Sequence, residues 1–461
     1  MYKLHLILKY LRRRRIAWVS LIAVMLCTTM VIVVISVMGG WLRMFRESFH
    51  NISGDVLVQG RSLLGFPHYQ QMIKQIEALP EVQTAAPVIR TWGFVNVNNQ
   101  IRQGVSVIGY PANIGQVNGF TKSLFRMEDA KELSFKLPLP ADEYRPPPGF
   151  DPRGKDPKTW DGMIAGDALI GFNKDAHGKI DRPLDVLYHA FAVLTVVPIS
   201  AEKAAPELTD KTMRFYWLVD DSRTNVSFQD ANTVYVPFEA LQRDLQMDGQ
   251  GGEPARTTDI QIALKPGASL GQAREKIAQI VDQVTDQFGR DFHYPYTVMT
   301  WQETHARFLG QVEKEKVLMT FLFGIISVVA IFLIFCIFYM IVVEKTRDIG
   351  IVKSVGATSS GVAGIFLGYG ASIGIVGAGL GLLASFLIVH NINWLHAKLG
   401  ELMGIQLWSA DTYLFDTIPS TMNPREVSVI LVVAIFSSIV GALVPAIRAA
   451  RMHPVEALRW E

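Results

Sequence analysis

The stretch EKTRDIGIVKSVGAT, residues 344–358, decides how this chain is organised. It follows residues 317–343, a run without a single charged side chain, and it precedes a second long, glycine-rich apolar run. About 20 apolar residues in a helix are enough to cross the hydrocarbon core of a bilayer. A compact charged segment between two such runs must therefore lie at a membrane face.

Within this segment, charges of both signs alternate with apolar residues that recur at helical spacing. The pattern predicts a short amphipathic helix that docks into a groove on a partner protein, although a solvated turn between two spans is the simpler alternative. The residues that we assign to docking are Glu344, Lys345, Arg347, Asp348, Ile349, Lys353, Val355 and Gly356.

The apolar content of the chain is concentrated in four runs, residues 16–38, 317–343, 362–388 and 427–447. Each is long enough to span a membrane, so we predict four transmembrane helices. The net charge of +2 over 461 residues gives no indication of nucleic-acid binding. Cys27 and Cys336 fall inside two of the runs, which favours apolar packing over a disulfide or a metal site.

Basic residues predict the orientation. Two lysines and four consecutive arginines precede the first run without an acidic residue among them, and the 344–358 segment and the C-terminal tail are also basic. The segment between the third and fourth runs is instead richer in acidic residues. By the positive-inside rule, both termini are cytoplasmic, and residues 41–316 lie outside the cytoplasm.

The predicted organisation therefore has nine parts. They are a basic cytoplasmic helix (residues 1–15), a first span (16–40), an extracytoplasmic domain (41–316), a second span (317–343), a cytoplasmic docking helix (344–361), a third span (362–388), an extracytoplasmic loop (389–426), a fourth span (427–447) and a cytoplasmic tail (448–461).

The large segment between the first two spans has mixed α/β patterning. One helix is predicted over residues 69–79, before Pro80, and another after Ser269, which forms a predicted capping box with Gln272. Strand-like runs occur at residues 56–58, 105–108, 193–197, 234–236 and 260–264. We predict an α/β domain built from the two ends of the segment, with a β-rich subdomain between them.

Residues 137–157 are rich in proline, which resists both helices and sheet ladders. Within them, GFDPRGKD (residues 149–156) imitates a phosphate-binding loop, but Asp156 stands where a magnesium-binding Ser or Thr is required. We therefore predict no nucleotide site here, and the chain offers no catalytic motif and no paired histidines for a metal. Gly374, Gly377, Gly379 and Gly381 in the third span favour close helix packing.

Four stretches resemble one family. LKYLRRRR (residues 8–15), VISVMGGW (34–41), the 344–358 segment and VPAIRAARMHPVEALRWE (444–461) are similar to the membrane subunits of ABC transporters of the FtsX-like permease group. The similarity is greatest to the lipoprotein-releasing permeases. ISGDVLV (52–58) fits the first extracytoplasmic strand, and the proline-rich stretch looks like an insertion into the family pattern.

The resemblance implies a non-catalytic, multi-pass inner-membrane subunit. A separate ABC-type ATPase dimer, which binds ATP and Mg²⁺, would dock on the 344–358 segment and drive the outer domain mechanically, so this chain needs no cofactor of its own. A second permease, identical or homologous, would complete the membrane part. In lipoprotein-releasing members a protruding hook hands the substrate to a soluble periplasmic carrier, and residues 202–212 align with that hook or form an ordinary hairpin.

The substrate is left open between three readings. Lipoprotein extraction is the first, export of peptides, toxins or macrolide-like drugs the second, and activation of a cell-wall hydrolase by a signalling subunit the third. The outer segment is long for the third reading, and the absence of a fused ATPase domain disfavours the drug-export version. Aromatic residues just outside the first span either line an acyl-chain entry site or serve as interfacial anchors: Trp41, Phe45 and Phe49.

Overall fold

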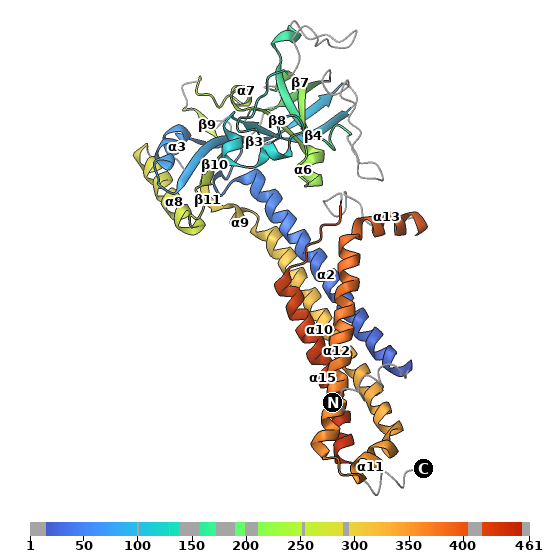
Figure 1. The fold of residues 1–461 in the computed structure, drawn as a ribbon. Helices are drawn as coiled ribbons and strands as arrows, with labels where there is room; N and C mark the ends of the chain where they lie inside the picture. The colour runs from blue at the N-terminus through green and yellow to red at the C-terminus, as the bar shows by residue number, and fades with distance from the viewer. Residues whose placement is uncertain are drawn as a thin grey trace. The chain divides into compact units, whose positions relative to one another are not determined.

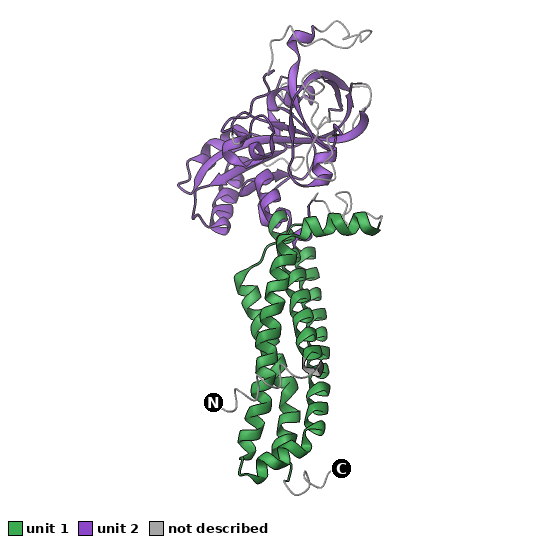
Figure 2. Ribbon diagram, turned by 45° about the vertical axis from the view of Figure 1, so that its right-hand side comes forward, with its two compact units in different colours: residues 1–44, 310–407, 418–461 green, residues 45–309, 408–417 purple. Residues whose placement is uncertain are grey.

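The structure is a computed structural model that describes residues 15–98, 101–128, 130–137, 156–171, 190–198, 211–250, 254–288, 295–403 and 417–453. The basic residues 1–14, almost all of the proline-rich stretch, residues 202–210 of the hook-like segment and the last eight residues lie outside these ranges. The chain divides into two compact units (Figure 2). Unit 1 comprises residues 1–44, 310–407 and 418–461, and unit 2 comprises residues 45–309 and 408–417.

Among the described residues, four helices are long and apolar enough to cross a membrane, as predicted. They are α2 (Arg15–Ser53), α10 (Ala306–Glu344), α12 (Ser359–His390) and α15 (Pro424–Arg451). Helices α2 and α10 each have 39 residues, or about 58 Å, against the roughly 30 Å of a hydrocarbon core. Both therefore continue well beyond the apolar runs from which the spans were predicted.

Two shorter helices complete the described part of unit 1. Helix α11 (Thr346–Ser354) joins α10 to α12 at one end of the bundle, and α13 (Ile392–Met403) follows α12 at the other end (Figure 1). The charged segment at residues 344–358 is thus helical over Thr346–Ser354, although α11 is shorter than the predicted docking helix.

Glycines allow α12 to approach two neighbouring helices closely. A Cβ placed on Gly374 would lie 2.9 Å from Cβ of Ser438 in α15, and one on Gly377 would lie 2.9 Å from Cβ of Val24 in α2. Such distances are too short for real side chains, so these positions accept only glycine without movement. The prediction holds for Gly374, Gly377 and Gly381 but is wrong for Gly379, where no described atom lies within 4 Å of an added Cβ.

Unit 2 is built on one nine-stranded sheet in the order β11-β1-β10-β3-β4-β8-β5-β7-β6, beside a small sheet of β2 and β9. The strands are β1 (Val56–Gly60), β2 (Phe66–Pro67), β3 (Val82–Val97), β4 (Ile101–Tyr110), β5 (Asp161–Gly166), β6 (Phe191–Val196), β7 (Thr212–Ser222), β8 (Thr233–Pro237), β9 (Arg256–Thr257), β10 (Asp259–Leu264) and β11 (Tyr296–Thr300). The predicted α/β class is confirmed.

Strand β3 belongs to both halves of this sheet. Its first half, from Val82 to Val88, pairs with β10, while its second half pairs with β4 on one side and β6 on the other. Because β6 also pairs with β7, the strands β3-β4-β8-β5-β7-β6 close into a six-stranded barrel. This barrel is the predicted β-rich subdomain, whereas β11, β1, β10 and the start of β3 form the open part.

The open part is covered by α3 (Tyr69–Glu77) and α8 (Leu270–Gln287). Both helices present a buried apolar stripe, which in α8 includes Ile277 and Val281. The predicted capping box at Ser269 is wrong, because this residue occupies the N-cap without a capping hydrogen bond from its side chain. A complete capping box instead opens the short helix α9 (Trp301–Thr304), where Thr300 and Glu303 bond each other's backbone N–H.

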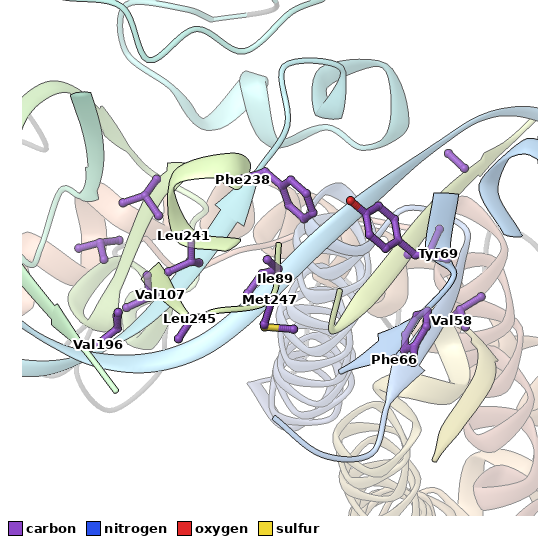
Figure 3. Packing of buried hydrophobic residues seen from close by; sticks show 14 of the residues in the cluster. Val58, Phe66, Tyr69, Ile89, Val107, Val196, Phe238, Leu241, Leu245 and Met247 are labelled. Carbon is purple, nitrogen blue, oxygen red and sulfur yellow. The ribbon is translucent and has the colours of Figure 1, made fainter. Parts of the chain in front are cut away.

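The largest apolar core of unit 2 runs through the barrel and under these helices. Figure 3 shows Phe238, Leu241, Ile89 and Val107 among the side chains of this core, and the ring of Phe238 meets that of Tyr69 edge-on at 6.1 Å. The remaining short helices are α4 (Ile114–Val117), η1 (Phe120–Ser123), η3 (Pro157–Thr159), α6 (Ser227–Asn232) and α7 (Phe238–Asp244). The segments that flank the proline-rich stretch are joined, because the N–H of Gly162 donates to the carbonyl of Phe135 at 3.1 Å.

Candidate functional site

Helix α11 is fastened to the rest of the bundle along one face. Ile349 is buried in a cluster with Val342 of α10, Val362 of α12 and Ala449 of α15. At the start of the helix, the hydroxyl of Thr346 donates to the carbonyl of Val343 at 2.8 Å. Helix α11 therefore contacts three of the four spans.

Lys353 makes the most directed of these contacts. Its Nζ donates to the carbonyls of Ala450 and Met452, each at 2.7 Å, where α15 ends. The last carbonyls of a helix have no intrahelical donor and carry the negative end of the helix dipole, so a lysine is a favourable cap. This residue faces inward, where it serves the bundle itself rather than an external surface.

The other face of α11 is open. Glu344, Arg347 and Asp348 are exposed, and Asp348 pairs with Lys345 one turn earlier. Val352 and Val355 are exposed as well, Val355 at 83%. Residues three apart on a helix are offset by about 60° around its axis. Ile349, Val352 and Val355 are spaced in this way, so Ile349 is buried while Val352 and Val355 lie on the open side.

The eight predicted docking residues are thus split between two faces. Those on the open surface are Glu344, Arg347, Asp348, Val355 and Gly356, while Lys345 is half-buried and Ile349 and Lys353 face the bundle. Ile351, exposed at 48%, belongs to the open surface but was missing from the predicted set. Its position on the helical wheel between Arg347 and Val355 was the available signal. We call the residues Glu344, Arg347, Asp348, Ile351, Val352 and Val355 the open face of α11.

Helix α11 ends in a turn that requires glycine. Gly356 has φ +104°, and its N–H donates to the carbonyl of Lys353 while that of Ala357 donates to Val352. These two bonds form a Schellman motif, in which a left-handed glycine follows the helix. Thr358 then caps α12 by accepting the N–H of Gly361 at 3.1 Å. The turn therefore fixes the angle between α11 and α12.

A second feature of unit 1 is a cavity of about 500 Å³ between α2, α10 and α15. Apolar and small side chains form most of its wall. These include Val24, Cys27, Val31 and Ile35 of α2, Phe323, Gly324, Ser327 and Ile334 of α10, and Val429, Val433, Ala434 and Ser437 of α15. Such a wall offers an apolar slot between three membrane-spanning helices, and part of the slot is open, since Val429 and Val433 are 62% and 47% exposed.

Charged residues stand at one end of this cavity, where α15 begins beside Lys316 of α10. Lys316 and Glu426 form an ion pair at 2.7 Å, with about a third of each side chain exposed, and Arg425 also lines the cavity. We call these three residues the rim. All three residues lie just outside the predicted spans. Their proximity could not be predicted, because it depends on how α10 and α15 align.

Two of the three aromatic residues predicted for substrate contact, Phe45 and Phe49, pack against other aromatic rings. Phe45 is fully buried, with its ring 4.5 Å from that of Phe308, and Phe49 stacks on His305 at 4.2 Å. Burial lowers the pKa of His305 to about 4, so this ring is neutral in the stack. Trp41 belongs to unit 1, whereas Phe45 and Phe49 belong to unit 2. A role for the three in substrate contact stays a prediction.

Three buried acids of unit 2, Asp220, Asp230 and Asp259, have pKa values raised by burial, a property common at catalytic sites. Burial raises the pKa of Asp230 to about 7 and that of Asp220 to about 6. Asp230 accepts bonds from Thr224, and Asp220 accepts the backbone N–H groups of Arg126 and Asp221, so both hold loops in place. Within the described residues, no three His, Cys, Asp or Glu side chains are grouped to hold a metal ion.

These features define a multi-pass membrane protein with a large α/β domain inserted after its first span. Family models agree: residues 320–454 match the FtsX-like permease C-terminal region, and residues 17–134 match the MacB-like periplasmic core domain. The chain belongs to the FtsX-like permeases of ABC transporters, which are inner-membrane proteins.

Similar proteins extend over nearly the whole chain. The lipoprotein-releasing system transmembrane protein LolC of Xylella fastidiosa is 23% identical over 98% of both chains, and so is LolC of Neisseria meningitidis. The transmembrane protein LolE of the same system in Haemophilus influenzae is 26% identical over 46% of this chain and 53% of its own length.

Proposed function

We propose that this chain is the membrane subunit of an ABC transporter that extracts or releases lipid-anchored proteins from the inner membrane. The names of the relatives that span the full chain support this substrate class. In this proposal both termini are cytoplasmic, as the distribution of basic residues predicts. ATP and Mg²⁺ bind to a partner ATPase, and this chain turns over no substrate chemically.

The apolar cavity with its charged rim is the observation that carries the proposal. A lipid anchor consists of acyl chains joined to a polar group, so it needs an apolar slot that ends in polar side chains. The cavity has this layout, with Lys316, Arg425 and Glu426 at one end of an otherwise apolar wall. In the proposed topology this end lies toward the outside, where the protein part of the substrate is found.

The open face of α11 is the proposed docking surface for the ATPase. It combines charges of both signs with exposed Ile351, Val352 and Val355, which suits a groove on a partner. A second permease, identical or homologous, would pack against the exposed apolar faces of the spans, and a soluble carrier would receive the substrate.

Filling the cavity should block release. In Gly324→Phe the added side chain starts from a Cβ with no described atom within 4 Å, so the helix is expected to form normally while the ring occupies the slot. Because overpacking a bound chain costs about 1–3 kcal/mol, we expect release of a triacylated model protein from proteoliposomes to fall about tenfold or more. The matched control is Gly364→Phe, equally open but on α12 away from the cavity. Equal release by both variants would refute the cavity as the anchor site.

Reversing a charge on the open face should detach the ATPase. Arg347→Glu places a third acid beside Glu344 and Asp348, and like charges in an interface cost several kcal/mol, whereas within an exposed helix they cost only tenths. We expect the variant to insert and fold but to lose co-purification of the ATPase by about a hundredfold. Lys398→Glu, an exposed cation of α13, serves as the control. Wild-type recovery of the ATPase with Arg347→Glu would overturn this docking surface.

A further inference from the structure

We infer that Lys353 is a positioning residue that transmits movement of α11 to α15 and thereby opens or closes the apolar cavity. The inference rests on the proposed function, because it takes α11 to be the element that the ATPase moves. It assigns to this lysine a role different from the docking role that its sequence context predicted.

The geometry separates Lys353 from the other contacts of α11. Ile349 packs in a cluster shared by α10, α12 and α15, so its contacts are apolar and do not favour one helix. Lys353 instead directs two charge-assisted hydrogen bonds, both 2.7 Å long, to the end of α15. A non-directional cluster lets helices slide, whereas a charged donor on two carbonyls holds one helix end at a defined place.

Beyond this tied end, α15 contains a point of reduced stiffness. Pro445 lies inside the helix and has no N–H to donate to the carbonyl of Gly441, which removes one bond of the helical ladder. Such positions are where helices bend. On the far side of Pro445, the segment with Val429, Val433 and Ser437 lines the cavity.

A continuous path therefore leads from the open face of α11 to the cavity. A displacement of α11 moves the carbonyls of Ala450 and Met452 through Lys353, and the proline lets the remainder of α15 change its tilt. The rim pair Lys316–Glu426 joins the far end of α15 to α10, so a tilt of α15 acts on that pair as well. The arrangement predicts that removing the tie leaves ATPase docking intact but uncouples it from the cavity.

The test compares three variants of the full chain in complex with its ATPase. Lys353→Met removes the charge but keeps most of the apolar stem, Lys353→Arg retains charged donors, and Lys398→Met is a control lysine outside this path. One reading is release of the model lipid-anchored protein per ATP hydrolysed. The other needs no substrate: in a Cys336→Ser background, Cys27 in the cavity wall reports the cavity through its rate of thiol labelling with and without ATP.

For Lys353→Met we expect the ATPase to co-purify and hydrolyse ATP as in the wild type, whereas release per ATP and the ATP-dependent change in Cys27 labelling each fall about tenfold, the effect of losing a charge-assisted hydrogen bond. Lys353→Arg should restore most of both readings. A purely structural cap would lower thermal stability without changing these ratios.

Unchanged Cys27 labelling in Lys353→Met would overturn the inference, and so would loss of the ATPase, which would make Lys353 a docking residue. Should Lys353→Met fail to insert, Lys353→Gln, a neutral donor, decides by the same readings. Failure of lipoprotein release in the wild type, with ATP-dependent Cys27 labelling that needs Lys353, would refute the substrate class alone.

Discussion

Gly377→Leu is expected to prevent stable assembly of the helix bundle. A Cβ at this position would lie 2.9 Å from both Cβ and Cγ1 of Val24 and 3.3 Å from the carbonyl oxygen of Leu21 in α2. A leucine there must push α2 away from α12, and overpacking of this kind costs about 3 kcal/mol or more. The measurement is the fraction of full-length protein that remains folded in lipid nanodiscs during heating.

The control lies two residues further along the same helix. Gly379→Leu meets no described atom within 4 Å of its Cβ, and its side chain points to the open side of α12. We expect this variant to melt within a few degrees of the wild type, because exposed substitutions in an apolar environment change little. Equal losses in the two variants would mean that α12 and α2 are not packed as described.

The second large effect is expected in unit 2, at an ion pair whose carboxylate is buried. Arg214 of β7 forms two hydrogen bonds with the carboxylate of Asp244 at the end of α7, at 2.6 and 2.5 Å, and Asp244 is only 6% exposed. Arg214→Met leaves this charge buried without its partner, which costs about 3 kcal/mol or more. In full-length protein, amide hydrogen exchange in β7 and α7 should then accelerate about a hundredfold.

A double variant checks that the unpaired charge is the cause. Replacing both members, as in Arg214→Met/Asp244→Leu, removes the charge together with its partner and should recover most of the lost protection. Exchange in α3, on the open part of the sheet, serves as the internal reference. A double variant as unstable as the single one would show that packing of the arginine stem, rather than its charge, holds this part of the barrel.

The sequence predicts the individual helices, but it does not predict contacts between residues far apart in the chain. The spans, α3, α8 and the helicity of α11 follow from local patterns, because apolar length and periodicity do not depend on distant residues. The orientation of Lys353 depends on the end of α15, about a hundred residues away, and the rim depends on Lys316 meeting Glu426. Neither apposition leaves a signal in the local sequence.

The closure of the sheet into a barrel could likewise not be predicted from the sequence. The strands β4, β8 and β10 are visible as short β-branched runs, but the pairing of β6 with β3 joins segments about a hundred residues apart. The failed capping box at Ser269 shows the opposite limit. The sequence contains the residues of a capping box, but the capping bond does not form. Helix α8 is held instead by its buried apolar stripe, which consists of Ala273, Ile277, Val281 and Val284.

The bond between Gly162 and Phe135 has a consequence for how this domain can change over evolutionary time. It joins the two segments that flank the proline-rich stretch. These two segments keep the same position in the barrel however many residues separate them in the sequence. Doubling a loop whose ends are already held costs only about 0.6 kcal/mol of closure entropy. Extra sequence can therefore accumulate, shorten or be exchanged for a foreign module between these anchors while the strands around it keep their register. The domain can therefore accept insertions at this place in different lineages without a change in the surrounding strands.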